Sequence, residues 1–430
     1  MDEQPVSQHS LALVGASLID GTGGAPLDDA AVVIRGDSIA EVGSSARVEI
    51  PADAARVSCH GMTLMPGLID VHTHLHEDGH PSVLRRMKET VPYAALRSGV
   101  HAARILDAGF TTIRDLGSIG FTDVATKKAI GDGLIRGPRM IVAGHMLVPS
   151  GTEEDGYFRP EVATYRTGIE RGVVDGPDGL RRAVRIQLYH GADVIKVAAT
   201  GRIFSDTGGG PDVPTFAEDE LRAACGEAHR HDARVAAHAY GARGIRAAVS
   251  AGVDSIEHGG NLDGELAERM REQGTFLVPT FSMLRRAVEH ADELPAPIAE
   301  RARKLQDVHF DSFRYALQAG VQIACGTDCG NPFVFPGDNA CELAFLIEAG
   351  MSPMQAIVSA TGAAGRLLGL GDRIGTITPG KWADLLVVDG DPLLDVKLLQ
   401  DRARIRLVMK GGGIQRTDLR LDSAVEADVV

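Results

Sequence analysis

A His-x-His pair, His72-Thr73-His74, ends an apolar run that begins at Leu64. In a β-strand, side chains two positions apart project from the same face, so both imidazoles would point toward one place. Neutral imidazole nitrogens are common ligands of zinc and other transition metals. A single pair of this kind is more often structural or solvated, so a metal site requires further ligands elsewhere in the chain.

Further candidate ligands lie near the carboxyl ends of separate expected strands: Lys196, His238, His258 and Asp328. In a barrel of parallel strands, the carboxyl ends of all strands converge on one face. Four imidazoles and a carboxylate there can hold two divalent cations, with zinc the favoured ion.

Lys196 interrupts the apolar strand Val194–Val197, where an uncompensated ammonium group is costly. One interpretation is a buried lysine paired with a carboxylate. The other is that burial deprotonates the amine, which then takes up carbon dioxide. The resulting carbamate is an anion that can bridge two cations.

The middle of the chain, about residues 64–365, alternates between apolar strands and helical patterns. Ser352-Pro353 places an N-cap and a proline at the start of one helix, and Thr215–Glu218 predicts a capping box that opens another, through His229. Eight buried strands are expected: Leu64–His74, Thr111–Leu116, Met140–His145, Val194–Ala198, Val235–His238, Ser255–His258, Phe276–Thr280 and Gln322–Thr327.

Eight strand–helix units over roughly 300 residues predict an α/β protein with a (β/α)8 TIM barrel. The alternative, an open doubly wound sheet, is disfavoured because no Gly-x-Gly-x-x-Gly follows the first strand. Two long irregular stretches, Val148–Val173 and Arg202–Pro214, are candidates for substrate-recognising loops, or else surface loops without substrate contact.

Both ends of the chain read as short strands separated by turns. Such ends, around a different middle, predict one small β-sandwich built from both termini. We therefore expect an N-terminal sandwich part (1–63), the barrel (64–365) and a C-terminal sandwich part (366–430). The expected terminal strands are Leu11–Ile19, Ala31–Ile34, Ile39–Val42, Leu385–Val388 and Ile405–Met409.

The composition is that of a globular protein, with 44% hydrophobic and 24% charged residues. The formal net charge of -14 disfavours nucleic-acid and anionic-membrane partners, which an acidic surface repels. No apolar run reaches the roughly 18 residues of a transmembrane helix. The acidic start, Met1–Pro5, is unlike a signal peptide and predicts a cytoplasmic protein, although an export signal removed from a natural precursor stays open.

The set of candidate ligands resembles that of the metal-dependent amidohydrolase superfamily. Its binuclear members carry His-x-His on strand 1, a carboxylated lysine on strand 4, histidines on strands 5 and 6, and an aspartate on strand 8. The matching residues here are His72, His74, Lys196, His238, His258 and Asp328, and the flanks Pro66–His74, Gly326–Asp328 and Gly375–Leu385 are similar too. The resemblance implies two Zn²⁺ or other divalent ions per chain, with Lys196 N-carboxylated.

Two segments, His238–Gly241 and Ala143–His145, look like the branch of prolidase-like and Xaa-amino-acid dipeptidases. That branch also contains N-acyl-amino-acid hydrolases and enzymes that cleave the mycotoxin ochratoxin. The resemblance therefore implies a homo-oligomeric hydrolase of small molecules. It would use a metal-bridging hydroxide to cleave an amide bond adjacent to a free carboxylate.

The resemblance also implies roles near the metals. Asp328 would take the proton of the attacking water and return it to the leaving amine. His145 would polarise the developing oxyanion, or else serve only as a structural residue after strand 3. Tyr240 would hydrogen-bond the substrate carboxylate, or else pack at the barrel mouth. Arg202, where relatives tend to have glycine, would pair with a substrate carboxylate or lie on the rim.

A cyclic-amide or imidazolone hydrolase is the main rival activity. A deaminase is disfavoured by Lys196, and a non-catalytic scaffold by the complete ligand set. Cys325 and Cys329 are expected to fill the core. Arg114 and Asp115 are expected to form a structural pair, the alternative being that Asp115 supports a metal ligand through a hydrogen bond. The other histidines are expected to be structural or solvated: His9, His60, His76, His80, His101, His190, His229, His231, His290 and His309.

Overall fold

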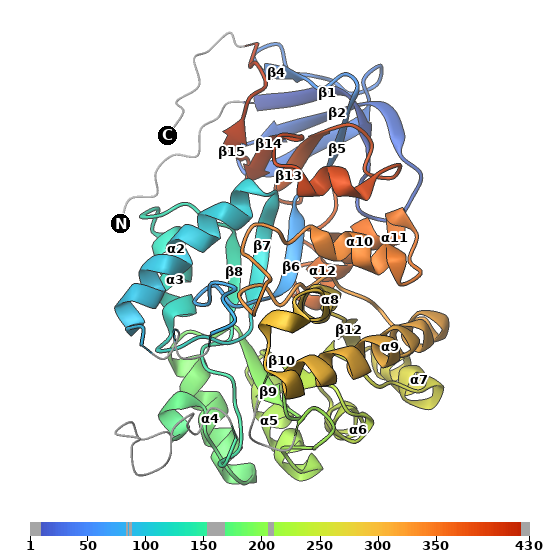
Figure 1. Cartoon of the computed structure of the whole chain (residues 1–430). Helices are drawn as coiled ribbons and strands as arrows, with labels where there is room; N and C mark the ends of the chain where they lie inside the picture. Colours follow the sequence, from blue (N-terminus) through green and yellow to red (C-terminus); the bar gives the residue numbers. More distant parts are fainter. Residues whose placement is uncertain (1–9, 83–84, 86–87, 153–167, 205–209, 423–430) are drawn as a thin grey trace.

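The computed structural model describes residues 10–82, 85, 88–152, 168–204 and 210–422. The acidic start of the chain, His9, and parts of both expected long loops (153–167 and 205–209) lie outside the described residues. The fold is α/β. A β-rich unit lies at the top of Figure 1, and a region of alternating strands and helices lies below it.

The β-rich unit is one eight-stranded sheet drawn from both ends of the chain. Its order is β15-β14-β13-β5-β1-β2-β3, with β4 beside β1. The expected terminal strands are all present, and strands from both chain ends pair in this sheet. The strands pair into a single sheet, so the two-layered sandwich is not confirmed. The strands are β1 (Ser10–Leu18), β2 (Leu27–Arg35), β3 (Ser38–Ser44), β4 (Ala55–Ser58), β5 (Met62–Pro66), β13 (Leu385–Asp389), β14 (Ile405–Lys410) and β15 (Gly413–Thr417).

One hydrophobic core supports this sheet. Leu13 and Val32 from the N-terminal strands pack in the same cluster as Val387 and Leu407 from the C-terminal strands, and all four are buried. Removal of this apolar surface from water is the main force that holds the two chain ends together.

The first strand of the middle region is shorter than predicted. The expected strand Leu64–His74 is divided into β5, in the terminal sheet, and β6 (Leu68–Thr73). The chain changes sheets at Gly67, where an added Cβ would lie 2.2 Å from Oγ1 of Thr111. The expectation was wrong here because a continuous apolar run does not show that its two halves are buried in different sheets.

The middle region contains two parallel sheets. One has the order β6-β7-β8, and the other β12-β11-β10-β9. These seven strands match the first seven expected strands in order. Their bounds are β7 (Phe110–Asp115), β8 (Arg139–Val142), β9 (Val194–Ala198), β10 (Arg234–Ala239), β11 (Ser255–His258) and β12 (Phe276–Val278).

The eighth expected strand, 322–327, is not regular. Isolated parallel bridges join Ile323 to Leu277 of β12, and Cys329 to Thr73 of β6. On the other side, Leu147 after β8 bridges to Val197 of β9. These isolated bridges connect the edges of the two sheets. Asp328, directly after this segment, has a left-handed backbone, with φ of 62°.

Helices follow the strands and lie outside them (Figure 1). Within the described residues, no helix combines the length and apolarity needed to cross a membrane. The helices are α2 (Val91–Asp107), α3 (Thr122–Gly131), α4 (Pro177–Tyr189), α5 (Glu218–Arg230), α6 (Ala242–Ala251), α7 (Gly264–Gln273), α8 (Phe281–Glu289), α9 (Ala296–Ala319), α10 (Cys341–Glu348), α11 (Pro353–Ser359) and α12 (Gly362–Leu367).

One of the two expected helix caps is confirmed. Ser352 caps α11, and its Oγ accepts from the backbone N–H of Gln355 at 3.2 Å. The capping box at Thr215 is wrong, because the N-cap of α5 is Ala217 and the hydroxyl of Thr215 donates to a backbone carbonyl of β9. A tertiary contact has taken the side chain that the local pattern assigned to the helix.

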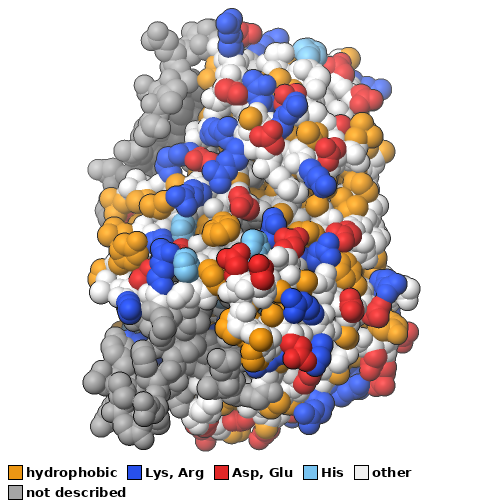
Figure 2. Space-filling view, in the orientation of Figure 1, with side chains coloured by type: hydrophobic (Ala, Val, Ile, Leu, Met, Phe, Trp, Pro, Cys, Tyr) orange, Lys and Arg blue, Asp and Glu red, His pale blue; other side chains and the backbone are white. Residues whose placement is uncertain are grey.

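The visible face in Figure 2 mixes acidic, basic and hydrophobic side chains. A group of hydrophobic side chains lies at the left edge, where Figure 1 places α2. Tyr93, Leu96 and Val100 of α2 are exposed. On this face acidic and basic side chains are interspersed, and neither sign forms a large patch of its own.

Candidate functional site

The six expected ligands come together at the carboxyl ends of the strands. Nε2 of His72 lies 3.4 Å from Oδ1 of Asp328 and 3.3 Å from Nζ of Lys196. Nε2 of His74 lies 3.2 Å from the same Asp328 oxygen. On the opposite side, Nε2 of His258 lies 2.9 Å from Nδ1 of His238.

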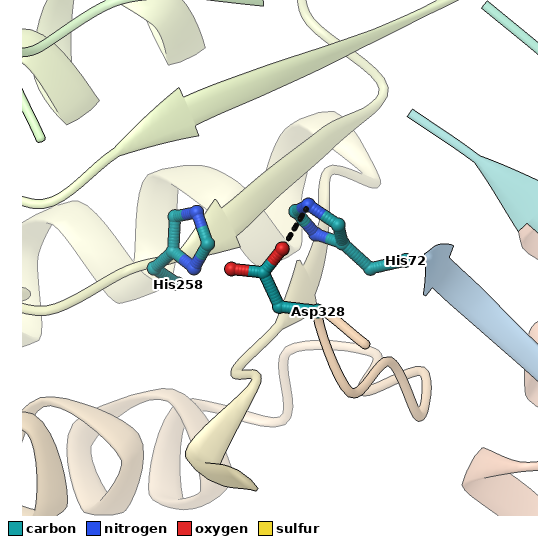
Figure 3. A group of neighbouring side chains, drawn as sticks. All are labelled: His72, His258 and Asp328. Carbon is teal, nitrogen blue, oxygen red and sulfur yellow. Dashed lines mark ion pairs between the residues drawn. The ribbon is translucent and has the colours of Figure 1, made fainter. Parts of the chain in front are cut away.

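Asp328 occupies the centre of this arrangement. Figure 3 shows its carboxylate between the imidazoles of His72 and His258, which come from β6 and β11. One ligand atom from each of these three residues lies within 4.8 Å of the other two. All three side chains are buried, so bulk water does not compensate their polar atoms.

The histidines are held so that one nitrogen of each faces inward. The outer nitrogens of His74 and His238 lie 3.0 Å and 3.2 Å from the carbonyl oxygens of Gly117 and Gly201. A carbonyl only accepts, so each outer nitrogen carries the proton and donates. The inner nitrogens of both rings are therefore lone-pair donors when the rings are neutral.

In His258 the outer nitrogen also carries the proton, and its acceptor is a hydroxyl oxygen. Its Nδ1 lies 2.7 Å from Oγ1 of Thr280, and that hydroxyl donates its own hydrogen to the carbonyl of Pro279. The hydroxyl oxygen therefore accepts from Nδ1 of His258. The lone pair of Nε2 then faces the lone pair of His238 at 2.9 Å, an arrangement that repels unless a cation or a proton lies between them.

The electrostatics of the site favour a cation. Burial lowers the pKa of His72 to about 4, and it is the main cause that places those of His238 and His258 well below the usual value. Burial acts in the same direction on His74, yet the Asp328 carboxylate raises the pKa of that imidazole to about 9. His72, His238 and His258 are therefore neutral near pH 7, whereas His74 must lose a proton before it can act as a ligand. Imidazole nitrogens around a buried carboxylate are the donor set that zinc prefers, and the residues present fit such a metal.

Asp328 is held as an anion. Burial alone would raise the pKa of its carboxyl, but the neighbouring imidazoles, first His72 and then His74, keep that pKa well below its usual range. The amide of Asn331 donates to Oδ1 at 2.7 Å. The carboxylate is thus fixed in orientation and charge by groups from its own loop and from β6.

Three residues at the site have left-handed backbones. His258, Thr280 and Asp328 have φ of 69°, 51° and 62°. Such conformations cost non-glycine residues about 1–3 kcal/mol each, and they cluster at functional sites. The two ligands adopt them as each strand segment ends, which turns their side chains into the common space.

Lys196 is buried in β9, and burial lowers the pKa of its amine to about 8. Arg202, on the loop after β9, is one of the smaller causes of this shift. Near neutral pH a fraction of the amine is therefore uncharged. An uncharged amine is the form that reacts with carbon dioxide.

Two of the expected substrate contacts lie beside the ligands. The ring of Tyr240 stacks on that of His258 with centroids 4.6 Å apart, and its hydroxyl is buried without a hydrogen-bond partner among the described residues. Arg202 donates to the sulfur of Met146 at 3.5 Å, and its charge also contributes, after burial and Lys196, to lowering the pKa of His238. Both side chains are therefore within electrostatic reach of the ligands.

His145 lies on the segment after β8. Its ring packs edge-on against Phe121, with centroids 4.5 Å apart, and its backbone N–H donates to Gln187. The side chain is almost fully buried. These contacts fix the position of the ring, whereas a part in catalysis stays a prediction.

The sequence analysis did not predict several residues that support the candidate ligands. Arg114 pairs with Glu257 at 2.8 Å, so the expected pair with Asp115 is wrong. Asp115 instead accepts from the backbone of Leu75, and Glu257 also contacts His72. Arg114 and Glu257 are charged residues within apolar strands, as Lys196 is. The same criterion would therefore have identified them as candidate site residues.

Asp70 was also missed. Its buried carboxylate accepts from the backbone N–H of His72 and from both the backbone and hydroxyl of Thr327. The amide of Asn339 donates to it as well. Burial raises the pKa of Asp70 to about 6, although these four hydrogen bonds oppose that effect.

The remaining histidines and cysteines lie elsewhere. Buried His101 and His309 contact the backbone carbonyls of Leu75 and His258. Cys325 and Cys329 are buried in the main hydrophobic core, as expected. Several other histidines form local contacts, such as His229 with Asp254 and His290 with Glu293.

Comparison with known proteins identifies the family. The model of the Amidohydrolase family matches residues 63–414. The chain belongs to this family. It is accordingly a hydrolase that acts on amide bonds.

This chain is similar to several other proteins over most of its length. Ochratoxinase of Aspergillus niger is 34% identical over 430 residues, covering 94% of this chain and 86% of the relative. Its crystal structure has a TM-score of 0.84 at 32% identity, covering 95% and 96% of the two chains. A Xaa-Pro dipeptidase with bound methionine has a TM-score of 0.88 at 32% identity, covering 94% and 99%. Imidazolonepropionase of Salinispora arenicola is 26% identical over 412 residues, covering 91% and 94%.

Proposed function

We propose that this amidohydrolase is a binuclear metal-dependent hydrolase. Its substrate would carry an amide bond next to a free carboxylate, as in a dipeptide, an N-acyl amino acid or ochratoxin A. The observation that carries the proposal is the convergence of inward-facing imidazole nitrogens on the Asp328 carboxylate. The similarity to ochratoxinase and to a Xaa-Pro dipeptidase supports the substrate class.

The distances divide the ligands into two groups. His72, His74 and Asp328 form one group, with contacts of 3.2 and 3.4 Å, and His238 with His258 forms the other. Lys196 lies in contact with the first group through His72. We infer that each group would hold one divalent ion, zinc being favoured, and that Lys196, once carboxylated, would supply a ligand to both.

Divalent ions held by these residues would polarise the scissile carbonyl and lower the pKa of a water molecule. Asp328 supplies the proton transfer. Its Oδ1 is engaged by Asn331, so we assign Oδ2 the role of accepting the proton from water and returning it to the leaving amine. The surrounding imidazoles keep this carboxylate ionised and ready to accept.

Tyr240 and Arg202 would recognise the substrate. The buried hydroxyl of Tyr240 requires a partner, and a substrate carboxylate or carbonyl oxygen supplies one. Arg202 adds a positive charge near the same ligands and would pair with the carboxylate. His145 would donate to the developing oxyanion.

The bridges between the two parallel sheets support a closed (β/α)8 barrel as the frame of this site. The domain limits at residues 63 and 365, the sandwich and the homo-oligomer stay predictions. Sedimentation of the purified protein tests the oligomer.

Matched substrates test the proposed activity. Zinc-loaded protein is assayed with a library of dipeptides and N-acyl amino acids, including ochratoxin A, beside analogues whose carboxylate is blocked as a carboxamide. We expect hydrolysis of the free acids and at least a tenfold lower kcat/KM for the blocked analogues. Equal rates on both would refute recognition of the carboxylate. Turnover of imidazolones or other cyclic amides alone would favour the rival activity that the imidazolonepropionase relative suggests.

Metal analysis tests the centre itself. We expect two tightly bound divalent ions per chain and loss of activity after treatment with a chelator. Lys196→Ala should lower metal content and activity together, and intact mass under native conditions should show one carbon dioxide adduct on the wild type only. Full activity in Lys196→Ala would exclude the bridging role.

A further inference from the structure

Glu257 lies directly behind the proposed metal centre and is fully buried. It comes from β11, one residue before His258, yet its side chain contacts a histidine of a different strand. Oε2 of Glu257 lies 2.8 Å from Nδ1 of His72 in β6. The carboxylate therefore crosses the barrel interior from one parallel sheet to the other.

The two carboxylate oxygens have separate partners. Oε1 accepts from Nη2 of Arg114 at 2.8 Å and from the hydroxyl of Ser255. Oε2 is left for His72. Arg114 is itself anchored, because its Nε donates to the carbonyl of Val71 at 2.6 Å. Three strands thus fix the position of one carboxylate.

Pairing with Arg114 alone is a poor explanation for this residue. A buried ion pair is often no more stabilising than apolar side chains of similar volume, since both charges lose their hydration. The contact between Glu257 and His72 also determines which nitrogen of His72 carries the proton. A carboxylate held by an arginine is ionised and only accepts, so Nδ1 of His72 must carry the proton.

We propose that Glu257 is a positioning residue that holds His72 in the Nδ1–H tautomer, with the lone pair of Nε2 directed at the metal centre. Nε2 is the atom that faces Asp328 and Lys196. This inference rests on the proposed metal-dependent function. Outer-shell partners of this kind typically contribute about 10–100-fold to metal affinity.

Glu257→Gln tests the proposal because it keeps the size of the side chain. The hydroxyl of Ser255 and Nη2 of Arg114 both donate toward Oε1, so the amide oxygen will take that place. The amide NH2 group then faces Nδ1 of His72 as a donor. His72 must respond by accepting at Nδ1 and carrying its proton on Nε2.

Two measurements report the outcome. The tautomer of His72 is determined by long-range ¹H–¹⁵N correlation on the chelator-treated protein with ¹⁵N-labelled histidine, the signal being assigned by comparison with His72→Gln. Zinc affinity is measured by competition with a chromogenic chelator. We expect Nδ1–H in the wild type, Nε2–H in Glu257→Gln, and an affinity about 10–100-fold lower in that variant.

Glu227→Gln is the matched control. Glu227 of α5 is also a buried glutamate paired with an arginine, Arg185, at 2.7 Å, and its described contacts include none of the proposed ligands. This variant should leave both the His72 tautomer and zinc affinity unchanged. An equal loss of affinity in both variants would reduce Glu257 to a structural residue and overturn the proposal.

The tautomer of His72 in the wild type tests the proposal even if Glu257→Gln does not fold. An Nε2–H tautomer of His72 in the wild type overturns the proposal directly. A wild type that shows Nδ1–H but binds no zinc supports the positioning by Glu257 and refutes the proposed function instead. The two failures are therefore distinguishable.

Discussion

The carboxylate of Asp70 accepts a 2.6 Å hydrogen bond from the hydroxyl of Thr327. Asp70 belongs to β6, two residues before His72, and Thr327 directly precedes Asp328. The bond therefore joins the two segments that carry one group of proposed ligands. The backbone N–H of His72 donates to the same carboxylate, so one buried anion sets the spacing of the two segments.

Asp70→Asn should destabilise the protein. One oxygen that accepts from Thr327 or Asn339 becomes an NH2 group, and a buried donor loses its acceptor. We expect a loss of about 2–3 kcal/mol in the free energy of unfolding, measured with urea on chelator-treated protein. The exposed Asp219→Asn in α5 serves as control and should change that free energy by less than about 0.5 kcal/mol. Similar stability of the two variants would contradict the role of Asp70.

Thr280→Val should weaken metal binding more than it weakens the fold. The substitution keeps the shape but removes the oxygen that accepts from Nδ1 of His258. We expect about tenfold lower zinc affinity by chelator competition. Thr63→Val in the terminal sheet removes a comparable buried hydroxyl that donates to Gly390, and should leave zinc affinity unchanged. Unchanged affinity in Thr280→Val would show that the hydroxyl does not orient the ring.

Gly326→Ala should disturb the contact between the irregular eighth segment and β6. An added Cβ would lie 2.8 Å from Cβ of His72 and 2.5 Å from Cγ1 of Val278. We expect a stability loss of about 1–3 kcal/mol in urea unfolding, together with reduced metal content. The same substitution at Gly226, in α5, meets no atom within 4 Å and should stabilise by about 0.5–1 kcal/mol. Stabilisation by both substitutions would be incompatible with this close approach.

His101 should make the stability of the chelator-treated protein depend on pH. Burial lowers the pKa of its imidazole, and Nδ1 donates to the carbonyl of Leu75 at 2.9 Å. 

Because the folded pKa of this imidazole is lowered by burial, its contribution to stability is complete above the unfolded value of about 6.5 and is lost as the pH falls below it. His101→Asn keeps a donor for Leu75 but cannot be protonated, so its unfolding free energy should fall less between pH 7.5 and 5. One such group contributes at most about 1.4 kcal/mol per pH unit. Parallel pH profiles of the wild type and the variant would contradict this assignment.

The sequence alone was sufficient to choose the proposed ligands and to place most of the strands in order. His72, His74, Lys196, His238, His258 and Asp328 could be chosen because charged or imidazole side chains at the ends of apolar strands are costly unless they have a partner. Seven of the strands were placed in order for a related reason, since buried parallel strands are continuous apolar runs.

Local patterns could not show where one sheet ends and another begins. The run from Leu64 is uniformly apolar, yet its first residues pair with β13 and its last ones with β7. Thr215 has the pattern of a helix cap but bonds to β9 instead. In both cases a partner distant in sequence decided the outcome.

The chemical state of the site was decided only by the tertiary structure. The sequence determined which side chains could bind a metal, because residue type and strand position are local properties. Which nitrogen of each imidazole carries the proton depends on acceptors from other segments, such as Gly117, Gly201 and Thr280. Those acceptors, and the pairing of Glu257 with Arg114, exist only once strands far apart in the chain have packed together, because a hydrogen bond requires its two atoms to lie about 3 Å apart.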